Sequence, residues 1–77
     1  MKSYEIHKKV GLDEYVGTKI RELRESKGYT QDQLCNVLPF GRTSLCNIES
    51  GRQKLILKNI EQICEALECK SSDILPF

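Results

Sequence analysis

Four polar side chains follow Gly41 within one short stretch of the chain, and their chemistry suits the recognition of nucleic-acid bases. A guanidinium such as that of Arg42 can donate two hydrogen bonds to O6 and N7 of guanine, and a carboxamide such as that of Asn47 pairs similarly with adenine. The methyl group of Thr43 suits contact with a thymine methyl group. The predicted base-contacting set is Arg42, Thr43, Ser44 and Asn47. Exposed polar residues are commonly only solvated, so this prediction depends on the elements around them.

Two short amphipathic helical patterns, joined by residues 39–41, surround this set. Leu34 and Leu38 lie on one face of the first pattern. Leu45 and Ile48 lie on one face of the second, away from the polar set. Helices this short are not stable alone and must pack against a third element. A tight angle between them turns the second helix outward, which is the geometry of a helix-turn-helix.

Helical periodicity and end signals predict an all-α fold with five helical segments. Asp13 is the predicted N-cap of the first segment, and Gly28 follows its end. Thr30 caps the second, and Ser71 and Ser72 cap the last. The predicted segments cover residues 13–27, 31–38, 42–50, 57–67 (beginning at 56 or 57) and 71–75.

The length and charge of the chain set further limits. Its 77 residues make one domain, predicted as residues 13–77 after an N-terminal arm of residues 1–12. The net charge is only +1, but it is unevenly distributed. Four cations face one carboxylate between residues 42 and 58, and four carboxylates face one cation between residues 61 and 77. Such an uneven field can orient a domain on phosphates.

Several classes of protein do not fit this sequence. No stretch approaches the ~20 apolar residues of a membrane span. The first residues lack the pattern of a secretory signal, so a cytoplasmic protein is expected. The chain has one histidine, His7, and shows neither a nucleophile–base–acid arrangement nor a phosphate loop, so we expect no enzyme. We also expect no cofactor and no small-molecule substrate, because so short a chain is too small to enclose a pocket for one.

The four cysteines do not predict a metal site or a disulfide. None has a CxxC spacing and no histidine is nearby, so no zinc site is expected. Disulfides are not expected in a chain without an export signal. Cys35, Cys64 and Cys69 lie on apolar helix faces as small buried hydrophobes. Cys46 precedes Asn47 outside the apolar face, and we predict that it is exposed and open to oxidation.

Four sequence motifs follow one another, without an insertion, between about residue 16 and residue 75. They are VGTKIRELRESKG, TQDQL, RTSLCNIESG, and LKNIEQICEAL followed by SDIL. In these motifs the chain resembles the Cro and phage-repressor type of helix-turn-helix family, also called the xenobiotic-response-element type. The resemblance implies a compact five-helix fold like that of lambda repressor, with the third helix in the major groove of double-stranded DNA. The predicted base-contacting set then occupies the positions that meet the bases.

The resemblance also implies a set of phosphate contacts. Gln31 begins the second helix, where free N–H groups and the helix dipole attract an anion. Ser50 and Arg52 follow the third helix, where the family contacts phosphate through backbone and side chains. Lys54 and Lys58 are less specific, since each is also explained as a solubilising surface charge. These five residues are the predicted phosphate-contacting set.

Three positions bear on how the helices are joined and oriented. By resemblance, Arg24 pairs with Glu49 and fixes the angle of the third helix. The family has glycine where Pro39 stands, and proline cannot adopt positive φ. We therefore expect a differently built turn in which Gly41 takes the irregular backbone angle. Glu68 also replaces a common glycine, after the fourth helix.

Together these features predict a transcriptional regulator that binds a pseudo-palindromic operator as a homodimer. Two identical reading helices about 34 Å apart would meet successive major grooves. The apolar tail of Ile74, Leu75 and Phe77 either forms part of the dimer surface or folds back onto the first and fourth helices. The arm around Tyr4 and Ile6 could also exchange between subunits. The alternative function is an antitoxin-type module, whose main partner is a toxin and whose DNA binding is autoregulatory.

Overall fold

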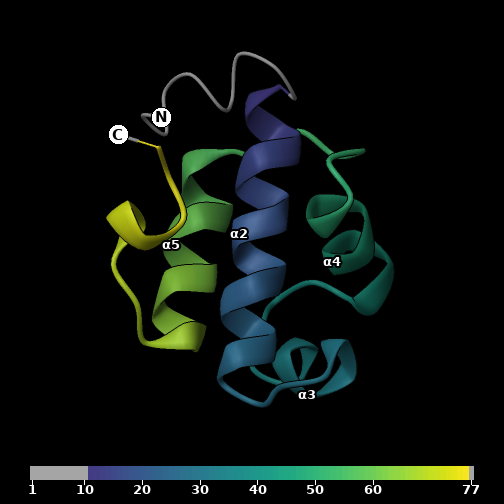
Figure 1. Cartoon of the computed structure of the whole chain (residues 1–77). Coiled ribbons are helices and arrows are strands. Elements are labelled where there is room, and N and C mark those ends of the chain that lie inside the picture. The colour runs from purple at the N-terminus through teal and green to yellow at the C-terminus, as the bar shows by residue number, and fades with distance from the viewer. Residues whose placement is uncertain (1–10, 77) are drawn as a thin grey trace.

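Four α-helices and one short 3₁₀ helix make up the described part of the chain. The computed structural model describes residues 11–76, and a grey trace marks the others (Figure 1). The helices are α2 (Leu12–Ser26), α3 (Gln31–Cys35), α4 (Arg42–Glu49), α5 (Leu57–Leu67) and the 3₁₀ helix η1 (Ser71–Asp73). Residues 11–76 contain no strand, so the predicted all-α fold is confirmed. The fifth predicted segment is a single 3₁₀ turn.

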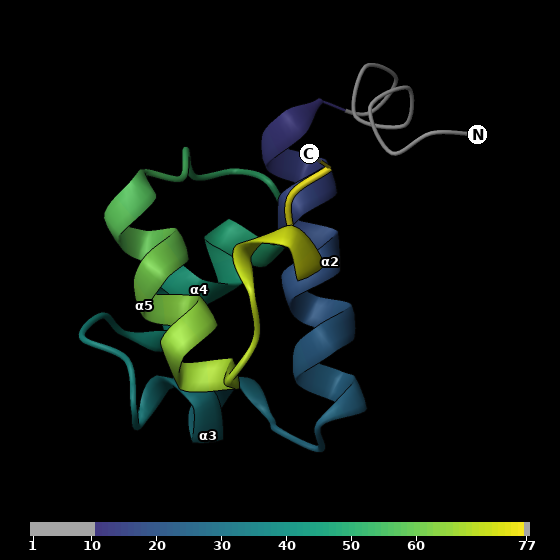
Figure 2. The same cartoon turned by 90° about the vertical axis from the view of Figure 1, so that its left-hand side faces the viewer.

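The longest helix, α2, occupies the centre of the domain. In Figure 1, α5 lies along one side of α2 and α4 along the other, with α3 near the C-terminal end of α2. The chain after α5 turns back toward the N-terminal end of α2 in both views (Figures 1 and 2). Helix α4 packs against α2 and α3, so two elements support it from behind.

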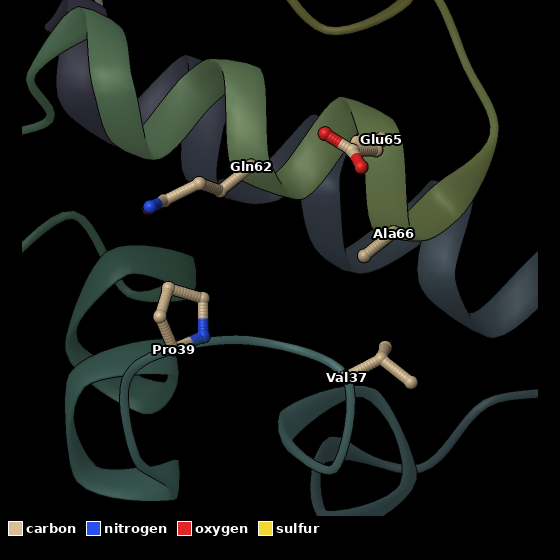
Figure 3. A pocket seen from close by; sticks show the side chains of 5 residues that line it. All are labelled: Val37, Pro39, Gln62, Glu65 and Ala66. Atoms are coloured by element: carbon tan, nitrogen blue, oxygen red, sulfur yellow. The ribbon is translucent and has the colours of Figure 1, made fainter.

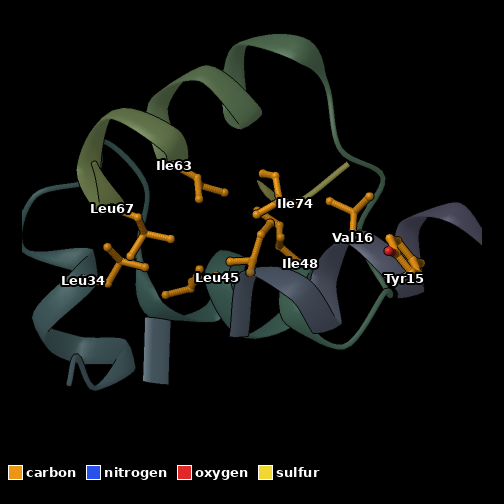
Figure 4. Packing of buried hydrophobic residues seen from close by; sticks show 9 residues of the cluster. Tyr15, Val16, Leu34, Leu45, Ile48, Ile63, Leu67 and Ile74 are labelled. Atoms are coloured by element: carbon orange, nitrogen blue, oxygen red, sulfur yellow. The ribbon is translucent and has the colours of Figure 1, made fainter. Parts of the chain in front are cut away.

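The core consists of apolar side chains that point inward from every helix except η1. Leu34, Leu45 and Ile48 are fully buried, as the two short amphipathic patterns predict. Figure 4 shows them meeting side chains of α2, α5 and the C-terminal segment. The buried apolar residues are Tyr15, Val16, Ile20, Leu34, Leu45, Ile48, Ile63, Leu67 and Ile74. Burying one Leu or Ile side chain contributes about 1.5–3 kcal/mol, so α3 and α4 depend on this core for their stability.

Glycines set both ends of α2. The helix begins at Leu12 with Gly11 (φ 85°) as its N-cap, so the prediction that Asp13 caps it is wrong. Asp13 lies instead in the first turn, where the helix dipole stabilises a carboxylate. The other end is as predicted. Gly28 has a φ of 83°, and its N–H donates to the Glu25 carbonyl at 3.0 Å.

Helix α3 begins as predicted but ends early. The Thr30 hydroxyl oxygen accepts a hydrogen bond from the Gln33 N–H at 3.1 Å, which confirms Thr30 as the N-cap. The helix ends at Cys35 rather than at residue 38. Beyond that point the hydrogen bonds span three residues, as in a 3₁₀ turn. The Leu38 N–H donates to the Cys35 carbonyl at 3.2 Å. Pro39 disfavours helical backbone at the residue before it, which explains the early end.

The turn before α4 is built without a left-handed residue. Gly41 has φ −84° and ψ 178°, so the prediction that it takes an irregular angle is wrong. None of residues 36–41 has a positive φ. The chain turns instead through i to i−3 hydrogen bonds after α3 and extended backbone before α4. Gly41 is the N-cap of α4.

The segment after α5 contains a left-handed residue and an unexpected cap. Glu68, in place of the family's glycine, has φ 54° and ψ 48°. The prediction that Ser71 and Ser72 cap the last turn is wrong. The Lys70 N–H precedes η1 and donates to Asp73 Oδ2 at 2.9 Å.

The C-terminal tail folds back onto the domain. Ile74 is fully buried, which confirms the folded-back alternative for this residue and removes it from the candidate dimer surface. Leu75 is partly buried against the same core. Phe77 lies outside the described residues, as do Tyr4 and Ile6 of the N-terminal arm.

Candidate nucleic-acid interface

The outward face of α4 brings together three of the four predicted base-contacting residues. At 3.6 residues per turn, Arg42, Thr43 and Asn47 lie on one arc of the helix. Leu45 and Ile48 occupy the opposite, buried arc. A shallow hollow of about 330 Å³ on the outward side is lined by Gln31, Arg42, Thr43, Cys46 and Asn47. The sequence therefore predicted the face correctly, with two exceptions.

The exceptions are Ser44 and Cys46. Ser44 is half-buried and does not line the hollow. Cys46 is exposed, as predicted, and lines it. Cys46 lies four residues after Arg42 and three after Thr43, so helical spacing alone would have placed it on the same face. We therefore count Cys46 among the residues of this face.

Two contacts fix α4 against α2. Gly17 allows the two backbones to approach closely, since a Cβ atom there would lie 2.2 Å from the Ile48 carbonyl oxygen. Arg24 and Glu49 form the ion pair that the resemblance implied. Arg24 Nε lies 2.7 Å from Glu49 Oε2 and Nη2 lies 3.0 Å from Oε1, and both residues are buried. The hydrogen bond to Glu49 raises the pKa of Arg24 against the opposing effect of burial, so the guanidinium stays charged.

Hydrogen bonds lead from this buried pair to the outward face. Gln31 Nε2 donates to Glu49 Oε1 at 3.0 Å, and Gln31 Oε1 accepts from Arg42 Nε at 3.5 Å. Arg42 Nε also lies 3.6 Å from Asp32 Oδ1. The side chain of Gln31, predicted to contact phosphate, therefore connects the buried ion pair to Arg42 in this structure.

The backbone N–H groups of the residues after α4 donate hydrogen bonds to carbonyl groups of the last turns of α4. Gly51 (φ 78°) ends the helix, and the Arg52 N–H donates to the Asn47 carbonyl at 2.9 Å. The Ser50 N–H donates to the Cys46 carbonyl at 3.1 Å. The backbone N–H groups of this segment are therefore already used within the chain, which leaves its side chains as the groups that can reach a phosphate. The exposed polar side chains here are Ser50, Arg52, Lys54 and Lys58.

Arg21 of α2 is a cation beside this surface that the predicted sets did not include. A small hollow of about 140 Å³ is lined by Arg21, Gln31, Cys46, Glu49 and Ser50. Arg21 Nε lies 3.7 Å from Glu25 Oε2, and both side chains are exposed. Only the packing of α2 against α4 brings Arg21 here, so no spacing in the sequence could have indicated it.

This arrangement matches that of a known family. A family model described as a helix-turn-helix domain matches residues 16–74. The chain belongs to this family. The resemblance to the Cro and phage-repressor type is thereby confirmed.

Relatives of this helix-turn-helix chain are transcriptional regulators. The competence pilus inhibition repressor of Acinetobacter baylyi is 30% identical over 59 residues, which cover 77% of this chain and 54% of that protein. A putative helix-turn-helix-type transcriptional regulatory protein of Thermococcus kodakarensis is 37% identical over 62 residues, which cover 77% of this chain and 20% of that protein. The chain thus spans about half the length of the first relative and a fifth of the second.

Solved structures agree with this assignment. The restriction-modification controller protein C.AhdI from Aeromonas hydrophila has a TM-score of 0.77 and 27% identity, covering 80% of this chain and 94% of that chain. The clp gene regulator ClgR from C. glutamicum has a TM-score of 0.79 and 27% identity, covering 82% of each chain. The helix-turn-helix fold is therefore shared with regulators of known structure.

A third hollow of this helix-turn-helix domain lies away from the outward face of α4. It measures about 350 Å³ and is lined by Val37, Pro39, Gln62, Glu65 and Ala66, between the turn after α3 and the last turns of α5 (Figure 3). Its lining contains one carboxylate and no cation. It therefore lacks the charge that phosphate contact needs, and we do not include it in the candidate interface.

The other cysteines are half-buried. Burial raises the pKa of the Cys35 thiol, and burial together with the neighbouring Cys64 raises the pKa of the Cys69 thiol to about 11. Both thiols therefore stay protonated at neutral pH. Residues 11–76 contain no cluster of His, Cys, Asp and Glu that could hold a metal ion. No helix in the same range is long and apolar enough to cross a membrane.

Proposed function

We propose that this chain binds double-stranded DNA sequence-specifically in the cytoplasm and regulates transcription, with α4 in the major groove. The observation that supports this proposal is the uncovered polar arc of α4. Arg42 and Thr43 are exposed on it and Asn47 is half-buried, whereas Leu45 and Ile48 on the opposite arc are fully buried. Regulators and a repressor among the relatives support a role in transcription.

The base-reading roles follow from the donors and acceptors on this arc. Arg42 would pair with guanine, Asn47 with adenine, and the Thr43 methyl group would contact thymine. Ser44, at the edge of the arc, would contribute a hydroxyl group, which can either donate a hydrogen bond to a base or accept one from it. The Cys46 thiol would lie between these contacts.

The proposed phosphate contacts flank this arc. Lys54 and Lys58 follow α4 as exposed cations, and Ser50 and Arg52 have exposed side chains at its C-terminal end. Gln31 belongs to the set through the family resemblance. Contacts of this kind set the register of the protein on DNA and depend on salt, but they carry no sequence information.

We also propose that the chain acts as a homodimer. An eight-residue helix such as α4 is about 12 Å long, which spans three to four base pairs. So few base pairs do not define a unique site in a genome. Two copies of α4 about 34 Å apart would read two half-sites on one face of a pseudo-palindromic operator.

Selection of bound duplexes from a random pool tests this proposal. Enrichment of two inverted half-sites, with centres about 10 base pairs apart, is the expected result. The oligomeric state on the enriched duplex, measured by sedimentation, should be two chains per site. A pool that stays random after several rounds would overturn sequence-specific binding, and a single half-site bound by one chain would overturn the homodimer.

A further inference from the structure

The guanidinium of Arg42 is held from one side only. Its Nε lies 3.6 Å from Asp32 Oδ1 and 3.5 Å from Gln31 Oε1. Gln31 is itself fixed, because its Nε2 donates to the buried Glu49 at 3.0 Å. Within residues 11–76, neither terminal nitrogen of Arg42 donates a hydrogen bond. The two Nη groups, which would pair with guanine, therefore have no hydrogen-bond partner in that range.

Asp32 places an exposed negative charge directly beside Arg42 on the candidate interface. The side chains of Arg42 and Asp32 are 65% and 72% exposed, so water screens their attraction and the pair adds little to folding stability. The same exposure means that a DNA phosphate approaching Arg42 also approaches the carboxylate of Asp32. The pair therefore bears on binding more than on stability.

Phosphate and guanine differ in how they respond to that carboxylate. A free arginine at this position would bind a phosphate on any sequence, because phosphate contacts are sequence-independent. A carboxylate beside the arginine repels the charged phosphate but has a much weaker effect on the neutral O6 and N7 acceptors of guanine. Discrimination gained in this way comes from disfavouring the wrong partner.

We propose that Asp32 is a specificity-determining positioning residue, which holds Nε of Arg42 and keeps phosphates away from it. This inference rests on the proposed function, because it assumes that Arg42 meets bases. The repulsion of one phosphate about 6 Å away in water corresponds to about threefold in affinity for each subunit, or about tenfold for a dimer.

The test compares Asp32→Asn with wild type on the selected duplex and on an unrelated duplex of equal length. Asp32→Asn removes the charge but keeps an oxygen acceptor for Arg42. We expect binding to the unrelated duplex to tighten about tenfold for a dimer and binding to the selected duplex to tighten much less. The ratio of the two affinities should therefore fall, most clearly at the guanine position that Arg42 contacts.

Two further variants serve as controls. Glu22→Gln removes a carboxylate from a similarly exposed ion pair, with Lys19 at 3.7 Å, next to Asp73 and away from α4. It should leave the ratio unchanged. Asp32→Glu keeps the charge and should retain most of the wild-type ratio. Circular dichroism of each variant confirms that the fold is kept.

The outcomes separate this inference from the proposed function. If wild type prefers its selected duplex and Asp32→Asn changes both affinities by the same factor, the role of Asp32 is wrong and the proposed function stands. A similar fall in the ratio for Glu22→Gln would also overturn it, because the effect would then be one of net charge. If wild type shows no preference for any duplex, the proposed function fails first.

Discussion

Arg24 and Glu49 join the longest helix to the end of the outward-facing helix through two hydrogen bonds, of 2.7 and 3.0 Å. Each partner has a further contact. Arg24 Nη1 donates to the Tyr29 carbonyl at 2.7 Å, and Glu49 Oε1 accepts from Gln31. The pair therefore connects α2, the start of α3 and the end of α4. Any change in it should alter both the stability of the fold and the angle of α4.

Glu49→Ala should destabilise the domain strongly. It would leave the buried Arg24 charge with only the exposed carboxylate of Glu25, 3.9 Å away, as its partner, and breaking a buried ion pair costs about 3–5 kcal/mol. A domain of this size has about 4–12 kcal/mol of total stability, so this loss is a large fraction of the total. Urea unfolding followed by circular dichroism measures the change. The double variant Arg24→Met/Glu49→Leu is the control and should unfold at a higher urea concentration than Glu49→Ala. A loss below about 1 kcal/mol in Glu49→Ala would contradict the burial of this pair.

Gly17→Ala should destabilise the domain more than Gly28→Ala. Alanine normally favours a helix interior by about 1 kcal/mol over glycine. At Gly17, however, the added Cβ would lie 2.2 Å from the Ile48 carbonyl oxygen, so α2 and α4 must separate. Gly28 has open space around it and only its positive φ opposes alanine, at about 1–2 kcal/mol. The midpoint temperatures of thermal unfolding (Tm) of the two variants measure this difference in stability. An unchanged or raised Tm for Gly17→Ala would show that the helices do not approach so closely.

The features predicted correctly from the sequence are those with local causes. Thr30 caps a helix because its own hydroxyl reaches a nearby N–H, and Gly28 follows the end of a helix because it adopts positive φ. Leu45 and Ile48 are buried because their spacing defines one helix face. These signals lie within a few residues of the element that they define, so no tertiary information is needed.

The predictions fail where contacts between helices, or a different local turn, determine the structure. The early end of α3 depends on tightened hydrogen bonds before Pro39, and the last turn is capped by Asp73 rather than by a serine. In the candidate interface, Cys46 was not included in the predicted base-contacting set, although its helical spacing places it on the same face as Arg42 and Thr43. Arg21 and Asp32 join this surface only through contacts between helices. Sequence spacing along one helix does not contain that information.

Lys58→Gln should weaken binding to all duplexes by a similar factor. The change removes an exposed cation that we assign to phosphate, so the slope of log affinity against log salt should fall by up to about one unit for each subunit. Binding is measured at several salt concentrations on the selected duplex and on an unrelated duplex. Lys70→Gln, in the acidic C-terminal segment, is the matched control and should leave the slope unchanged. Equal slopes for Lys58→Gln and wild type would remove Lys58 from the phosphate set.

Folding stability should fall as the pH rises above about 9. Burial raises the pKa of Cys69 from 9.0 to about 11, so between these values the unfolded chain releases the thiol proton and the folded chain keeps it. The folded state then binds more protons than the unfolded state, and raising the pH favours unfolding. Urea unfolding at pH 8 and pH 10 measures the effect. Cys69→Ala should lose less stability over this range than wild type, and a parallel loss in both would contradict the assignment.

The central claim is that the outward arc of α4 reads bases, and Asn47→Ala tests it most directly. The carbonyl of Asn47 accepts hydrogen bonds from the helix end, and alanine keeps that carbonyl, so the fold should be unaffected. Affinity for the selected and unrelated duplexes is measured for wild type, Asn47→Ala and the control Asn36→Ala, which lies in the turn after α3. We predict a loss of about 1–3 kcal/mol on the selected duplex for Asn47→Ala, with relaxed selectivity at one position and little loss on unrelated DNA. An equal loss on both duplexes would show that Asn47 does not read sequence.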